Sequence, residues 1–194
     1  VEADGALMQI PLIVGGVVVT YNVPGVTGPL RLDGALLAEI FAGRVARWDD
    51  ARIRALNPGV RLPNLTIKVV TRLDPSGTTI VFTRFLAANS AAWQQSPGVG
   101  LSVPFPTGMT REGNESVASE VKVTVGAIGY VEQSYAMLNR LPTALVRNAH
   151  GNFVASTASS LIAAANSAAG PARSDGLPSS LLGATAADAY PIAE

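Results

Sequence analysis

Residues 68–83 read KVVTRLDPSGTTIVFT, and this stretch decides how the chain folds. The β-branched residues at its start are typical of a buried strand. The segment DPSG that follows fits a tight turn, and residues 77–88 are then expected to form a helix. A strand that runs through a short turn into a helix is the building unit of α/β proteins, so the stretch indicates that fold class.

The same turn predicts a site for a small tetrahedral anion. Ser76, Gly77 and Thr78 open the expected helix, where unpaired backbone N–H groups and the positive end of the helix dipole attract oxyanions. Arg72 ends the strand, and its planar charged group suits phosphate or carboxylate. The alternative is a connection that binds nothing, because Asp74 begins a sequence that fits an ordinary type I turn.

Strands and helices alternate through the rest of the chain. Strands are expected within residues 8–23, 65–71, 126–131 and 144–147, and one is expected to begin at Tyr190. Helices are expected over residues 33–42, 49–57, 89–95, 114–122 and 155–169, with one more ending near Arg140. Asp33, Asp49 and Asn114 are the expected N-caps of three of these helices.

Composition excludes several classes of protein. The 194 residues are 48% hydrophobic and 14% charged with zero net charge, which excludes a disordered polyelectrolyte and argues against a nucleic-acid partner. No apolar run approaches the roughly 18 residues of a membrane span. There is no cysteine, and no metal or cofactor is expected. The chain opens with VEAD, without an initiator Met or a signal segment, and we expect it to be part of a longer product.

Enzymatic functions have little support in the sequence. The single histidine, His150, lies in a turn-like segment and is expected to be a solvated surface residue. Nucleophile-elbow, phosphate-loop and zinc-protease motifs are absent. Arg111, Glu112 and Glu115 could line a cleft, although a solvated helix start is favoured. A phosphatase or esterase using Ser76 stays as the enzyme alternative, but it lacks an evident base. We expect a chain that is not an enzyme.

Several short motifs, taken in order, resemble one family. They are GGVVV at 15–19, NVPG at 22–25, LDG at 32–34, IFAG at 40–43, RWDD at 47–50, LNPG at 56–59, VTRLDPSGT at 70–78 and GAIGYVE at 126–132. Each is weak alone, but their order and spacing over nearly the whole chain resemble the periplasmic phosphate-binding protein of bacterial phosphate ABC transporters.

The resemblance implies the fold in more detail. Members of this family are two-lobed proteins that bury one dehydrated phosphate ion between the lobes. Residues 1–194 would form one α/β lobe of the type II periplasmic-binding-protein kind, with a mixed, mostly parallel sheet flanked by helices. Residues 1–12 and 188–194 would be the segments that cross between lobes. The second lobe would be largely missing from this sequence.

The resemblance also assigns roles to the turn. Arg72 would make charge-assisted hydrogen bonds to phosphate, and Asp74 would orient its guanidinium group. Ser76 and Thr78 would donate through hydroxyl and backbone groups, and Gly77 through its backbone N–H. No catalytic and no metal-binding residue is implied.

The sequence departs from the family pattern at two positions near this site, and it lacks a match to one acidic residue of the family's site. Pro75 stands where the family commonly has glycine and removes one backbone donor, and Thr71 stands where a second basic residue often lies. The family's other lobe supplies an aspartate that accepts the proton of hydrogen phosphate, and neither Asp4 nor Asp33 lies in a motif that matches the one around that aspartate. We therefore expect weak phosphate binding by this lobe alone.

The implied partners are inorganic phosphate, the membrane permease of an ABC importer and a second lobe. The implied location is the periplasm, or outside the cell as a secreted or surface protein. Two alternatives remain open. The chain could bind another oxyanion such as sulfate or molybdate, or it could be a structural or adhesive module that keeps the fold but not transport.

Overall fold

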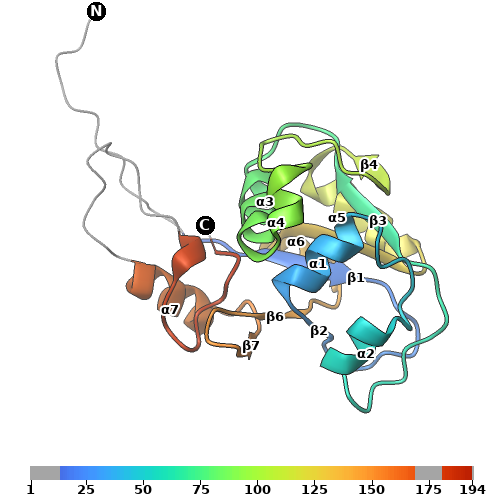
Figure 1. Ribbon diagram of the computed structural model, residues 1–194, viewed down its shortest axis with the longest axis horizontal. Coiled ribbons are helices and arrows are strands. Elements are labelled where there is room, and N and C mark those ends of the chain that lie inside the picture. Colours follow the sequence, from blue (N-terminus) through green and yellow to red (C-terminus); the bar gives the residue numbers. More distant parts are fainter. Residues whose placement is uncertain (1–13, 169–180, 194) are drawn as a thin grey trace, which may run out of the picture.

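The computed structural model of the chain describes residues 14–168 and 181–193, within which strands and helices alternate (Figure 1). The strands are β1 (Val17–Tyr21), β2 (Arg31–Leu32), β3 (Lys68–Arg72), β4 (Met109–Arg111), β5 (Ala127–Glu132), β6 (Leu145–Arg147) and β7 (Phe153–Val154). The helices are α1 (Gly34–Phe41), α2 (Ala51–Leu56), α3 (Gly77–Asn89), α4 (Ala91–Gln95), α5 (Gly113–Val123), α6 (Gln133–Asn139), α7 (Ala158–Ala168) and a 3-10 turn, η1 (Leu181–Gly183).

The strands form two sheets. The larger sheet has the order β1-β5-β3-β4, in which β3 runs parallel to both neighbours and β1 runs antiparallel to β5. The smaller sheet has the order β2-β6-β7, with β2 parallel and β7 antiparallel to β6. The expected α/β class with a mixed, mostly parallel sheet is therefore confirmed.

Helices cover both faces of the larger sheet, and two neighbouring residues of β5 show how. The ring of Tyr130 stacks on Phe82 of α3 with centroids 4.4 Å apart, and it also contacts Phe41 of α1. Gly129 points the other way, where an added Cβ atom would lie 3.0 Å from Val121 of α5. Because both faces are covered, the central strands β3 and β5 have runs of consecutive buried residues instead of alternating buried and exposed ones.

Most of the expected elements are confirmed within a few residues. The strands expected at 65–71, 126–131 and 144–147 are β3, β5 and β6, and the helices expected at 33–42 and 77–88 are α1 and α3. Residues 8–13 of the first expected strand lie outside the described residues, as does residue 169. The short strands β2, β4 and β7 were not predicted, because two or three residues carry too little pattern.

Of the three expected N-caps, one is confirmed and two are wrong. Asp33 caps α1 as expected, since its Oδ1 accepts a hydrogen bond of 2.8 Å from the N–H of Leu36. The prediction of Asp49 for α2 is wrong. The cap is Asp50, which accepts from the N–H of Arg52 at 2.9 Å, whereas Asp49 pairs with Arg47.

The third expected cap, Asn114, is also wrong. Helix α5 begins at Gly113, so Asn114 lies inside its first turn, and Glu112 occupies the cap position without a side-chain cap bond. Gly113 has a φ of +73°, a non-helical conformation that glycine adopts readily, so the chain turns sharply there as it enters the helix.

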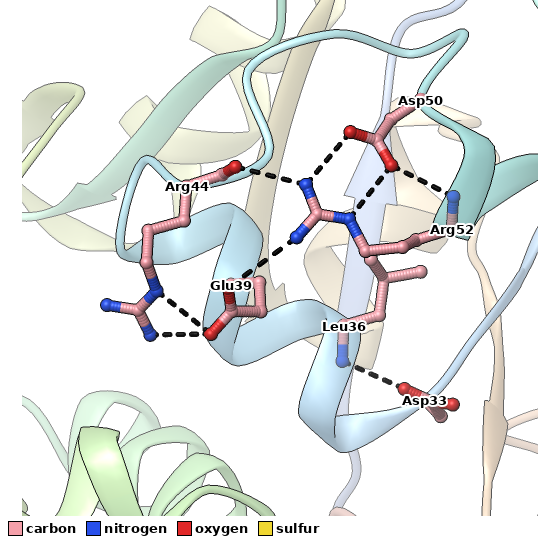
Figure 2. Close-up of polar contacts among 6 residues, drawn as sticks. All are labelled: Asp33, Leu36, Glu39, Arg44, Asp50 and Arg52. Atoms are coloured by element: carbon pink, nitrogen blue, oxygen red, sulfur yellow. Dashed lines mark hydrogen bonds and ion pairs between the residues drawn. The ribbon is translucent and has the colours of Figure 1, made fainter.

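A polar network fastens α2 to α1 (Figure 2). The guanidinium group of Arg52 contacts both carboxylate oxygens of Asp50, donates to the carbonyl of Arg44 at 3.1 Å and lies 3.6 Å from Glu39 of α1. Glu39 in turn accepts from Arg44 at 2.6 Å. Exposed ion pairs contribute little singly, but here one side chain joins the cap of α2 to the end of α1.

The two ends of the described chain lie side by side (Figure 1). The N–H of Val17 donates to the carbonyl of Ile192 at 2.9 Å, and the buried hydroxyl of Tyr190 donates to the carbonyl of Val17 at 3.0 Å. The strand expected to begin at Tyr190 is reduced to one isolated bridge between Gly16 and Ala193, because Pro191 cannot donate a ladder hydrogen bond. None of the helices in the described ranges is long and apolar enough to cross a membrane.

Candidate anion-binding site

The site begins where β3 passes into α3. Ser76 is the N-cap of α3, and its Oγ accepts a hydrogen bond of 3.4 Å from the N–H of Thr79. The N–H of Ser76 donates to the carbonyl of Leu101 at 2.8 Å, which fixes the turn. The 13-residue helix therefore points its positive end out of the carboxyl edge of the sheet, where open α/β sheets bind ligands.

Several hydrogen-bond donors at this helix start are uncommitted. Among the described residues, no acceptor contacts the backbone N–H of Gly77 or of Thr78. The hydroxyls of Ser76 and Thr78 each accept one hydrogen bond, and each keeps its own hydrogen available. An added Cβ on Gly77 would meet no atom within 4 Å, so the space above its backbone is open. The turn can thus surround a small anion with donors.

Arg72 is held beside this turn by Asp74. Its Nε donates to Asp74 Oδ1 at 2.8 Å, and its Nη2 makes a second, close contact with Oδ2. The Arg72 side chain is only 9% exposed, against 29% for Asp74. Within the described part of the chain, Arg72 Nη1 has no acceptor, so this end of the guanidinium group can donate to a ligand.

Both members of this pair are charged in the folded protein. The pKa of Asp74 lies well below its ordinary range, chiefly because of the hydrogen bonds from Arg72 and secondly because of the N–H of Gly113, which donates to Oδ1 at 2.9 Å. The same contact raises the pKa of Arg72. The pair has zero net charge, so attraction for an anion depends mainly on the placement of donors.

Three further residues support the site, and sequence reasoning missed their role. The hydroxyl of Tyr130 lies 2.8 Å from Thr79 Oγ1 and 3.5 Å from the N–H of Arg72, and burial raises its pKa. Gly113 bonds to Asp74, and Asn114 bonds to the hydroxyl of Thr78. No local pattern in the sequence signals contacts between residues so far apart.

The two positions that depart from the family pattern differ in burial. Pro75 is exposed in the turn. Thr71 is 1% exposed, and its hydroxyl has no hydrogen-bond partner among the described residues. A cavity of about 240 Å³ lies next to the end of β3, lined in part by Thr71, Arg72 and Leu73.

The residues considered for other functions do not join the site. His150 lies in the turn between β6 and β7 with its Nε2 2.5 Å from the carbonyl of Thr185. The only contact that Ser76 Oγ makes among the described residues is with the N–H of Thr79, so no base activates it. Arg111 pairs with Glu120 at 2.9 Å. In residues 14–168 and 181–193 no group of three or more His, Cys, Asp or Glu could hold a metal ion.

Comparisons with known proteins agree with this architecture. A family model described as "PBP superfamily domain" matches residues 1–194. The phosphate-binding protein PstS of Xylella fastidiosa (strain 9a5c) is 45% identical over 166 residues, covering 85% of this chain and 46% of the relative. The phosphate-binding protein PstS of Methanocaldococcus jannaschii is 40% identical over 198 residues, covering 95% of this chain and 51% of the relative. The chain thus spans about half the length of these relatives.

Solved structures show the same fold. A high affinity periplasmic phosphate-binding protein (PfluDING) bound with phosphate matches with a TM-score of 0.67 at 22% identity, covering 96% of this chain and 55% of that chain. The relatives named above are binding proteins and not enzymes, in agreement with the sequence. The match of the family model over the whole chain shows that this protein belongs to the PBP superfamily, and its resemblance to phosphate-binding members is confirmed.

Proposed function

We propose that this chain binds inorganic phosphate through Arg72, Ser76, Gly77 and Thr78, with Asp74 orienting the arginine. The observation that carries the proposal is the set of uncommitted donors at the start of α3, beside a guanidinium group fixed by a carboxylate. Phosphate is the anion named in the relatives, whose matches cover 85% and 95% of this chain.

The electrostatics of the site suggest how binding becomes tight. Because the Arg72–Asp74 pair is neutral overall, the anion is stabilised by dipoles and hydrogen bonds, which water weakens. Closure of a second lobe would exclude that water and supply further ligands. We therefore propose that residues 1–194 are one lobe of a two-lobed protein, a proposal supported by relatives about twice as long.

We further propose that residues 1–12 and 188–194 are the segments that cross between lobes. Support comes from the pairing of Val17 with Ile192 and from the buried Tyr190, which together bring both ends of the lobe to one place. Two segments that leave the lobe from adjacent positions could bend together as the lobes close.

The second candidate is binding of another oxyanion, sulfate or molybdate. The groups at the turn are donors, and Asp74 already accepts from Arg72 and Gly113. A site in which donors predominate recognises the proton of hydrogen phosphate poorly. Selectivity for phosphate would therefore depend on an acceptor outside the described residues.

In its physiological role the protein would deliver phosphate to the permease of an ABC importer, from the periplasm or the cell surface. The family resemblance and the name of the relatives support this role. This role can be measured as phosphate uptake by cells that lack the native gene and carry a complementing copy of it. Uptake that is restored equally by the Arg72→Ala variant would contradict the proposal.

Calorimetric titration of the full-length gene product tests the binding site. Arg72→Ala should weaken phosphate binding at least tenfold, because it removes a charge-assisted contact. Arg84→Ala is the matched control, since Arg84 is an exposed arginine on the same helix without a hydrogen bond or ion pair among the described residues. Equal affinities of the two variants would refute the assignment of Arg72.

A further inference from the structure

We propose that Asn114 of α5 is a positioning residue that keeps the hydroxyl hydrogen of Thr78 directed at the anion. This inference rests on the proposed function, because it assumes that Thr78 donates to a bound oxyanion. It concerns a residue that is expected from sequence only to cap a helix and that lies 36 positions away from Thr78.

The side chain of Asn114 is fixed at both of its polar atoms. Its Oδ1 accepts a hydrogen bond of 3.2 Å from the backbone N–H of Glu132, at the end of β5. Its Nδ2 donates a hydrogen bond of 3.4 Å to Thr78 Oγ1. Because a backbone N–H can only donate, the amide oxygen must face Glu132 and the amide nitrogen must face Thr78. The orientation of the amide group is therefore determined by its surroundings.

This orientation decides what the Thr78 hydroxyl can do. An amide NH₂ group has no lone pair to offer, so Thr78 Oγ1 must accept from Asn114 and its own hydrogen must point elsewhere. Thr83 on the same helix shows the alternative, since its hydroxyl donates to the carbonyl of Thr79 at 2.8 Å. Thr78 has no such bond among the described residues, and its hydrogen remains available on the open side of the turn.

The start of α5 supports the site in a second way. Gly113, the residue before Asn114, donates its N–H to Asp74 Oδ1 at 2.9 Å. Two consecutive residues of α5 thus contact the two sides of the turn, one through the acid that holds Arg72 and the other through Thr78. The bond from Glu132 ties this helix start to the central strand β5, which gives it a rigid base.

A double-mutant cycle on phosphate affinity tests the inference in the full-length gene product. Thr78→Val should weaken binding roughly tenfold and Asn114→Ala roughly fivefold, because each removes or misdirects one hydrogen bond to the anion. In the Thr78→Val background, Asn114→Ala should weaken phosphate binding by no more than about twofold, since the two residues act through one hydroxyl. Asn139→Ala is the matched control, because within the described residues the amide of Asn139 bonds only to the carbonyl of Tyr135 in α6.

The outcomes separate this inference from the proposed function. If Asn114→Ala weakens phosphate binding by the same factor with Thr or Val at position 78, or does not weaken it at all, the positioning role is refuted. If Arg72→Ala also leaves phosphate affinity unchanged, the proposed function itself fails. Should Asn114→Ala unfold the protein, Asn114→Asp replaces it in the cycle, because the carboxylate keeps an acceptor for Glu132. That variant should still lose affinity, since the Thr78 hydroxyl would turn to donate to the new carboxylate.

Discussion

Arg72 and Asp74 form a bidentate pair two residues apart, with Arg72 Nε 2.8 Å from Asp74 Oδ1. The pair connects the last residue of β3 to the turn before α3, so it holds the guanidinium group beside the N–H groups at the start of the helix. Asp74 also accepts from Gly113 at the start of α5. One carboxylate therefore joins three elements of the fold at the candidate site.

Asp74→Ala should lower the free energy of unfolding by roughly 1–3 kcal/mol, because it leaves the nearly buried Arg72 without its partner. Since the folded-state pKa of Asp74 is depressed, its contribution is present above the ordinary carboxyl pKa and is lost as the pH falls through the folded-state value. Urea denaturation of wild type and variant at pH 7 and at low pH measures the loss of stability and its pH dependence. A difference between wild type and variant that grows on acidification would contradict this account.

Asp50→Ala should destabilise the protein by about 1 kcal/mol through loss of the α2 cap, whereas Asp49→Ala should change stability by less than about 0.5 kcal/mol. Arg52 lowers the pKa of Asp50 from 3.8 to about 2, so the cap stabilises fully above pH 4 and is lost as the pH falls towards 2. Thermal denaturation of both variants at pH 7 distinguishes them. A larger loss for Asp49→Ala would show that the cap has been assigned to the wrong aspartate.

Thr71→Val should raise the free energy of unfolding by roughly 1 kcal/mol. Its buried hydroxyl lacks a hydrogen-bond partner among the described residues, and valine removes that unsatisfied group while keeping the β-branched shape that a strand favours. Chemical denaturation measures the change. Val70→Thr, at the neighbouring buried position, is the control and should be destabilising. A destabilised Thr71→Val protein would mean that the hydroxyl has a partner.

Local sequence was sufficient for the strand, turn and helix that carry the site. Residues 69–71 are β-branched, and the DPSG segment that follows fits a tight turn, so β3 and α3 could be predicted closely. The cap of α1 was equally readable, because Asp33 is followed by an apolar helical face. These features depend on neighbours in sequence.

The remaining details depend on contacts between distant residues. Asp49 and Asp50 are equivalent as local cap signals, and Asp50 is the one whose partner, Arg52, also reaches the carbonyl of Arg44 and Glu39 of α1. Asn114 has the composition of a cap, but its amide is engaged by Glu132 and Thr78. No single-sequence pattern reports such pairings, since they arise when β3, β5 and α5 pack together.

The central claim is that the uncommitted donors of Gly77 and Thr78 bind the anion, and their amide resonances test it most directly. In a phosphate titration of the ¹⁵N-labelled 194-residue protein, these two amides should show the largest chemical-shift changes. The midpoint should lie at or above about 1 mM phosphate, which corresponds to a binding free energy of roughly 4 kcal/mol or less. Sulfate should act within about tenfold of phosphate. Unmoved Gly77 and Thr78 amides at saturating phosphate, or submicromolar binding by this chain alone, would contradict the account.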